Sequence, residues 1–269
     1  MARGRGGWNT KSTWIAAVCL AAVLVLTAYS FLARDSEGGS DKQPVAQAPT
    51  ASPGASAPAS PQATYEAPED WTEPEKWAAL PRGQRTDKDG SQVGYPHTAE
   101  GAAAMAAAAS TTRVEGEHST SDEQMRIYAS YMGKADQTAD NAKKVKAAAE
   151  QTDKKLAAEM GVNADQPLPL GAYVRSHVVG YKVIKKSDDE VSVWLLARVV
   201  QRSGESAKES SSYTRTLLGM QWQDGDWKLT ADASRRAQVT ASNQSLPPMV
   251  APGDEEFNSG GWTAIREAS

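Results

Sequence analysis

The sequence predicts an α+β fold in which two or three helices pack on a curved antiparallel sheet of about four strands. Helical patterns in the middle of the chain are followed by strand patterns, an order typical of α+β domains. An uncharged run near the start and a Pro-rich stretch after it add a transmembrane helix and a disordered linker. The expected divisions are a cytoplasmic tail at 1–13, a transmembrane helix at 14–32, a linker at 33–68, an extracytoplasmic domain at 69–236 and a mostly irregular tail at 237–269.

Residues 14–32 contain no charged side chain, and this length is close to the roughly 20 residues that a helix needs to cross a bilayer. Basic residues such as Arg3 and Lys11 precede the run, whereas acids such as Asp35 follow it. Positive charge favours the cytoplasmic side, so the later residues should lie outside the cell. A cleaved signal peptide is the alternative, but the long apolar core and the bulky Phe31 near its end favour an uncleaved anchor. We therefore expect contact with the lipid bilayer through residues 14–32.

Cysteine, charge and histidine content narrow the possible functions. Cys19 is the only cysteine and lies within the apolar run, so the outer part of the chain has no disulfide and no thiol nucleophile. The net charge of −4 argues against nucleic acid as a ligand, because such binding depends on clustered Lys and Arg. The three histidines, His97, His118 and His177, are too scattered for metal-ligand spacing. We expect no metal, no cofactor and no nucleic acid contact.

The linker at 33–68 is rich in Ala, Pro and Ser and has too few apolar residues to build a core. Its prolines favour extended conformations, which suit a spacer between membrane and domain. Trp71 and Trp77 follow in a polar stretch. Large aromatic side chains in such a setting usually dock on a neighbouring surface, so we expect a strap packed on the domain, with an exposed binding site as the alternative.

Three helices are predicted before the strands. Thr98 is a suitable N-cap for a helix containing the alanine run 102–109, which we interpret as a tightly packed core helix. Ser121 and the glutamine three residues later have the spacing of a capping box, which predicts the start of a second helix. A third helix is expected over 138–160, where a thin apolar stripe ends at Gly161.

Four strands are predicted from the alternation of apolar residues, over 172–186, 191–201, 212–223 and 226–232. The second is apolar at nearly every position, so it should be central and covered on both faces. Asp224 and Gly225 separate the last two, and Asp-Gly between apolar strands is a strong hairpin signal. Trp222 and Trp227 flank this turn and should hold the two strands together.

Candidate site residues lie on the first predicted strand. Tyr173, Arg175, His177 and Tyr181 share one parity, so we expect them on one sheet face as pocket-lining or interaction residues. A histidine on a strand is more often structural than catalytic, and the sequence has no catalytic motif. We therefore predict that the protein is not an enzyme.

Phe257 and Trp262 stand in a Gly-rich part of the C-terminal tail. They could dock back on the domain, or form a short motif that folds on meeting a partner. The sequence leaves both interpretations open.

The order of helices and then strands closing on WQDGDWKL resembles the cone-shaped fold of nuclear transport factor 2 and its relatives. With the predicted topology, it is similar to the bitopic assembly proteins of conjugation and type IV secretion machines, such as the TcpC and VirB-type components. The segment GYPHTAEGAAAMAAAAS also resembles uncharacterised membrane-anchored proteins of actinobacteria. The resemblance covers residues 71–233.

This resemblance implies a membrane-anchored scaffold that contacts other subunits of an envelope-spanning, DNA-transferring complex, and it is compatible with a homo-oligomer. Relatives with the cone fold also include isomerases and dehydratases. A membrane-tethered small-ligand-binding protein or pocket enzyme of the cone fold is therefore the alternative function.

Overall fold

The computed structural model describes residues 71–266. The predicted tail, transmembrane helix and linker at 1–13, 14–32 and 33–68 lie outside these residues. Every helix within 71–266 is too short or too polar to span a bilayer.

The described residues form a mixed α+β domain around a seven-stranded sheet, in the order β1-β9-β5-β6-β7-β8, with β4 also paired to β5. A separate hairpin joins β2 to β3. The strands are β1 (Trp77–Ala79), β2 (Arg85–Thr86), β3 (Gln92–Val93), β4 (Thr112–Glu115), β5 (Ala172–Lys186), β6 (Glu190–Ser203), β7 (Ser210–Gln223), β8 (Asp226–Leu229) and β9 (Thr263–Arg266).

The predicted four-stranded arrangement is wrong, because three further strands belong to the sheet. β1, β4 and β9 have only three or four residues each, too few for a clear alternation of apolar side chains. In addition, β1 pairs with β9 in parallel, so the sheet is not purely antiparallel.

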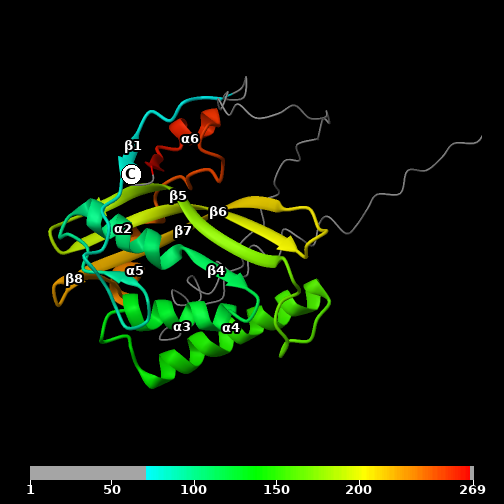
Figure 1. Cartoon of the computed structure of the whole chain (residues 1–269). Helices are drawn as coiled ribbons and strands as arrows, with labels where there is room; N and C mark the ends of the chain where they lie inside the picture. Colours follow the sequence, from blue (N-terminus) through cyan, green and yellow to red (C-terminus); the bar gives the residue numbers. More distant parts are fainter. Residues whose placement is uncertain (1–70, 267–269) are drawn as a thin grey trace, which may run out of the picture.

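Helices cover both faces of the sheet. They are α2 (Ala99–Ser110), α3 (Thr120–Tyr131), α4 (Ala139–Met160), α5 (Ala231–Ala241) and α6 (Glu255–Ser259). Figure 1 shows α3 and α4 side by side on one side of the sheet and α6 on the other. We call the side covered by α2, α3 and α4 the α2 face, and the opposite side the α6 face.

The main core lies between α2 and the sheet. Val193 and Leu195 of β6 belong to the same buried cluster as the alanines of α2. Thr98 caps α2 by accepting a hydrogen bond from the Gly101 N–H, as predicted. Small side chains on every side let the helix lie close to the sheet, so the interpretation of α2 as a tightly packed core helix is confirmed.

The α6 face is in equally close contact with its own helices. Gly219 of β7 pairs with Ser192 of β6, and a Cβ at Gly219 would lie only 2.2 Å from the carbonyl carbon of Ala233 in α5. Leu196, also on this face, packs with Phe257 and Trp262. β6 is therefore covered on both sides, as its continuous apolar sequence predicted.

The start of α4 was predicted correctly, whereas the start of α3 was not. α4 begins after its N-cap Thr138 and ends at Gly161, whose φ of 73° is left-handed, as expected. α3, however, begins two residues earlier than predicted: its N-cap is Ser119, and the capping box joins Ser119 to Asp122.

The Asp-Gly hairpin is confirmed. Asp224 and Gly225 have φ values of 53° and 78°, and Trp222 pairs directly with Trp227. The two indole rings lie edge to face with their centroids 5.4 Å apart. The last strand ends earlier than predicted, because Thr230 caps α5.

The N-terminal strap and the C-terminal segment pack together along one edge of the sheet. The Thr72 N–H donates to the Gly253 carbonyl over 2.7 Å, and β1 then runs parallel to β9. Phe257 and Trp262 are 0% and 1% exposed. Of the two interpretations left open for these aromatics, the structure shows the docked one, and the strap interpretation of the N-terminal segment is confirmed.

Candidate functional site

The four candidate residues on β5 do not share one face. Tyr173, Arg175 and His177 lie on the α6 face, whereas Tyr181 pairs with Leu195 and is buried on the α2 face. The register between β5 and β6 shifts between Val178 and Gly180. A bulge of this kind inserts one residue and reverses the alternation of side chains, so the prediction from parity is wrong.

Tyr173 and Arg175 line a shallow depression of about 630 Å³ at the end of the sheet, between β4, β5, β6 and the α4–β5 loop. The Arg175 guanidinium lies 2.7 Å from the Glu115 carboxylate and 4.2 Å from the centre of the Tyr173 ring. The Tyr173 hydroxyl donates to Glu209, and this hydrogen bond raises the pKa of Tyr173. His177 lies further along β5, outside this depression.

Glu115 is the charged centre of this depression. Hydrogen bonds from Arg113 and then Arg175 lower its pKa to about 2. The carboxylate is therefore ionised at neutral pH and held between two guanidinium groups. These groups satisfy one another and fix the end of β4 to β5.

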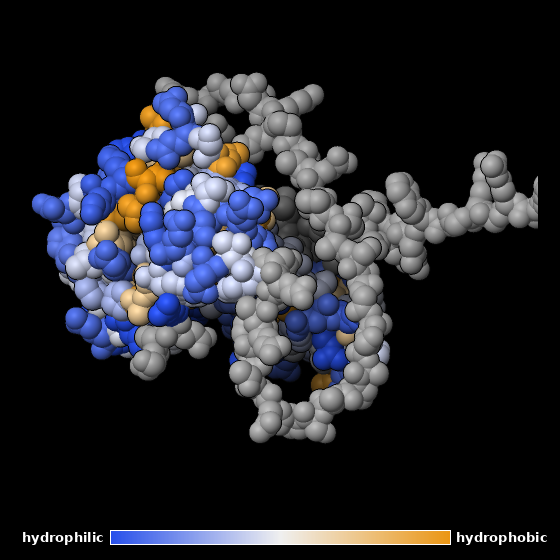
Figure 2. Space-filling model, turned by 90° about the horizontal axis from the view of Figure 1, so that it is seen from above, coloured by the Kyte–Doolittle hydropathy of each residue, from blue (hydrophilic) through white to orange (hydrophobic). Residues whose placement is uncertain are grey.

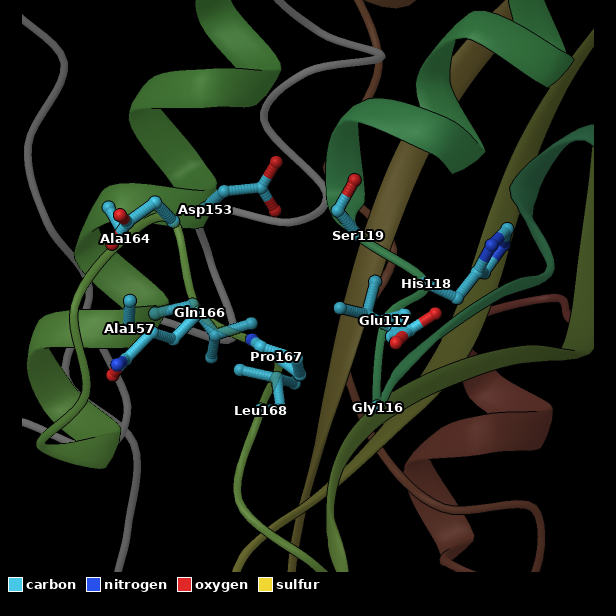
Figure 3. A pocket seen from close by; sticks show the side chains of 13 residues that line it. Gly116, Glu117, His118, Ser119, Asp153, Ala157, Ala164, Gln166, Pro167 and Leu168 are labelled. Carbon is cyan, nitrogen blue, oxygen red and sulfur yellow. The ribbon is translucent and has the colours of Figure 1, made fainter.

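A second depression of about 320 Å³ lies on the other side of the same loop (Figure 3). Its walls are the turn from Gly116 to Ser119, the C-terminal half of α4 and the loop 164–168. The loop is held to the turn by the Leu168 N–H, which donates to the Gly116 carbonyl over 2.9 Å. Both residues also line the first depression, so the two hollows flank one loop.

Asp153 and His118 of the second depression make structural hydrogen bonds, whereas the lining carboxylates of Glu117 and Asp165 are exposed. In Figure 3 the Asp153 carboxylate points from α4 toward Ser119. It accepts hydrogen bonds from the N–H groups of Thr120 and Ser121 at 2.7 and 3.0 Å, and from the Ser121 hydroxyl at 2.7 Å. Asp153 therefore neutralises the positive N-terminal end of α3.

His118 is similarly engaged. Its imidazole points away from α4 in Figure 3, and Nε2 lies 2.8 Å from the buried carboxylate of Glu123. Arg126 donates to the same carboxylate and to the Ser91 hydroxyl. This network ties α3 to the turn between β2 and β3 and leaves the His118 imidazole directed away from α4.

The aromatic cluster at the opposite end of the sheet has a structural arrangement too. His97 stacks on Trp222 with ring centroids 4.0 Å apart, and its Nε2 lies 3.1 Å from Asp189. Trp227 donates its indole N–H to the Pro96 carbonyl over 2.9 Å. The cluster fixes the segment before α2 to the β7–β8 hairpin.

The two depressions are therefore better suited to binding another protein than to catalysing a reaction. Most of their charged groups already hold structural contacts, the carboxylates of Glu117 and Asp165 are exposed, and no three His, Cys, Asp or Glu side chains within 71–266 are grouped to hold a metal ion. Leu170, in the loop between the depressions, is 80% exposed. Sequence reasoning missed this loop, although its run of prolines and leucines between a helix and a strand was a visible signal.

Comparison with known proteins gives a family but no characterised relative. No curated protein matches the chain, and no solved structure does. The model of the family described as "Domain of unknown function (DUF8175)" matches residues 35–247, which is more than half of the chain. The chain therefore belongs to this family.

Proposed function

We propose that this protein is a single-pass, membrane-anchored scaffold whose extracytoplasmic domain binds other protein subunits. The anchor is the uncharged run at 14–32, and the basic residues before it favour a cytoplasmic N-terminus. The Pro-rich linker at 33–68 would hold the domain away from the bilayer. In this proposal the domain works by contact and not by catalysis.

The observation that carries this proposal is the surface around the loop 161–171. Leu170 is 80% exposed between two depressions in which Arg175 and Asp153 already have structural partners. Contiguous exposed apolar surface with a polar rim is typical of protein contact sites, and Leu168, Pro169 and Leu170 are consecutive in this loop. A catalytic site would instead need a nucleophile or base aimed at a bound substrate.

The most specific setting that we propose is a conjugative DNA-transfer apparatus of actinobacteria, with other membrane-complex subunits as partners. The support is the resemblance of the helix-then-strand order and the WQDGDWKL hairpin to TcpC and VirB-type assembly proteins. In such a machine the protein would position subunits without touching the transferred DNA, in keeping with its net charge of −4.

The test replaces Leu170 with Asp in the full chain, in the cells that produce it, with Val239→Asp as the matched control. Val239 is 67% exposed on α5, away from the loop. We expect Leu170→Asp to reduce DNA transfer and crosslinked subunits at least tenfold, with normal amounts of protein in the membrane, while Val239→Asp changes neither. Unchanged transfer after deletion of the whole protein would exclude the conjugation setting. Unchanged crosslinking in Leu170→Asp would exclude this surface.

A further inference from the structure

β7 is much longer than the strand that covers its outer edge. On the inner edge β6 pairs with residues 210–221 of β7, whereas on the outer edge β8 pairs only with residues 220–223. β8 accordingly lies at one end of the sheet (Figure 1). Within the described part of the chain, residues 210–219 have no strand partner on this outer edge.

The direction of the backbone groups on this edge follows from one hydrogen bond. The Trp222 N–H donates to the Asp189 carbonyl, on the β6 side, over 2.9 Å. The directions of the N–H and C=O groups alternate along a strand. The odd-numbered residues of β7 therefore point their N–H and C=O groups away from β6, toward the outer edge. The outward row consists of Ser211, Tyr213, Arg215, Leu217 and Gly219.

This edge has few of the features that usually prevent pairing with another strand, since its one charged side chain, Arg215, is engaged with the Pro247 carbonyl. Residues 210–219 contain no proline and no lysine, and their register with β6 is continuous, without a bulge. Long edges without such protection are templates for a further strand. This edge would therefore bind a peptide segment in an extended conformation.

Two hydroxyl groups lie on the α2 face of this edge. Ser212 Oγ and Thr214 Oγ1 are buried and make no hydrogen bond, and Thr214 as a whole is only 5% exposed. Both oxygens are shielded from solvent in the single chain, so the pairing rests on the backbone edge, and the Ser and Thr side chains are compatible with it because such residues pair favourably across antiparallel strands.

The β7 strand of a second copy could pair with this edge, with compatible side chains on both faces of the joined sheet. If two copies pair antiparallel about a twofold axis at Thr214, each Thr214 faces its equivalent, and each Ser212 faces Thr216 of the second copy. On the α6 face, Tyr213 then lies opposite Arg215 of the second copy, a favourable cation–aromatic pair. An axis at Arg215 would instead place two arginines opposite each other, which is unfavourable.

Apolar side chains beside the edge would extend such a contact. Arg215 donates to the Pro247 carbonyl over 2.7 Å, which holds the segment around Pro247 next to β7. Leu246 and Met249 in this segment are 59% and 44% exposed. Figure 2 shows hydrophobic residues gathered in places on the otherwise hydrophilic surface.

We propose that two copies of this protein associate through the outer edges of β7, joining their sheets into one. The chain's own linker is a poorer occupant, because its prolines at positions 44, 49, 53, 58 and 61 lack the N–H that a strand must donate. A twofold axis is also the commonest symmetry of homo-oligomers. The inference does not depend on the proposed role in DNA transfer.

Single cysteines test the proposed register in the full chain in membranes. In a Cys19→Ser background no other thiol is present. Thr214→Cys should place two cysteines about 4.5 Å apart between Cα atoms, within the range of a disulfide. Ser212→Cys is the matched control on the same face: its two cysteines would be separated by four residues, about 13 Å, and cannot join.

We expect mild oxidation to convert most Thr214→Cys chains to a covalent dimer, with at least tenfold less dimer from Ser212→Cys. The double variant Ser212→Cys with Thr216→Cys should also form a covalent dimer. Circular dichroism and thermal melting of each reduced variant establish that it is folded. The proposal is overturned if folded Thr214→Cys crosslinks no better than Ser212→Cys, including the case in which another part of the same chain covers the edge and the protein is monomeric.

Discussion

Glu115 illustrates how a single partly exposed residue can make stability depend on pH. Its pKa is lowered from 4.5 to about 2 by Arg113 and Arg175. The folded state therefore favours the ionised form more than the unfolded state does. The resulting stability is fully present above pH 4.5 and is lost as the pH falls toward 2.

We predict that Glu115→Gln removes this part of the acid sensitivity. Between pH 4.5 and 2, the Tm of the unmodified protein should fall more steeply than that of Glu115→Gln. The difference should shrink in high salt, because exposed ion pairs are screened. Thermal melting over this pH range at two salt concentrations measures the effect. Glu150→Gln is the control, because Glu150 has only a weak ion pair, 3.9 Å from Lys146. Parallel Tm curves for Glu115→Gln and the unmodified protein would contradict the prediction.

The site residues show which information a strand pattern lacks. Tyr173 and Arg175 were correctly placed together, because the strand is regular between them. Tyr181 was placed on the wrong face, because one inserted residue reverses the alternation. The partners of Arg175 and Tyr173 come from other strands and loops, so their pairing with Glu115 and Glu209 depends on register that the sequence does not reveal.

At the scale of an element, the start of α3 is set by two different caps. Ser119 accepts from the Asp122 N–H within the capping box. Asp153, from α4, accepts from the N–H groups of Thr120 and Ser121. The two side chains therefore satisfy different unpaired donors of the same helix.

We predict that Asp153→Ala lowers the free energy of unfolding by about 2 kcal/mol, and that Ser119→Ala lowers it by about 1 kcal/mol. Asp153 has the larger expected effect because a charged acceptor makes three hydrogen bonds and joins two helices. Denaturant unfolding measures both variants, and Asp153→Asn, which keeps one acceptor oxygen, should fall between Asp153→Ala and the unmodified protein. An effect of Asp153→Ala no larger than that of Ser119→Ala would show that the contact between α3 and α4 adds little.

The elements themselves could be predicted where they are long and periodic. α2, α4, β5, β6 and the β7–β8 hairpin were expected at nearly their observed positions. The short strands could not be, because pairing in the folded sheet defines them more than their own residues do. The start of α3 was placed too late because two overlapping pairs have the spacing of a capping box, Ser119 with Asp122 and Ser121 with Gln124, and the fold uses the first.

At the scale of the whole molecule, the two ends of the described chain are held together. The side chain of Asn258 bridges them, since it accepts from the Glu75 N–H and donates to the Glu73 carbonyl. The family match ends at residue 247, before α6 and β9. The folded unit therefore extends beyond the matched residues.

The C-terminal segment should be required for the stability of the whole domain. Truncation after Pro252 removes Phe257 and Trp262, which cover Leu196, and removes β9, which links β1 to β5. Replacing one buried aromatic residue with alanine lowers stability by about 3–5 kcal/mol, and a whole domain has only about 5–15 kcal/mol. We expect the truncated protein to melt at least about 10 °C lower or not to fold, and Trp262→Ala to remain folded with a smaller decrease in Tm. If truncation left the Tm unchanged and only abolished binding to other proteins, the segment would be a partner motif and its packing on the sheet would contribute nothing to stability.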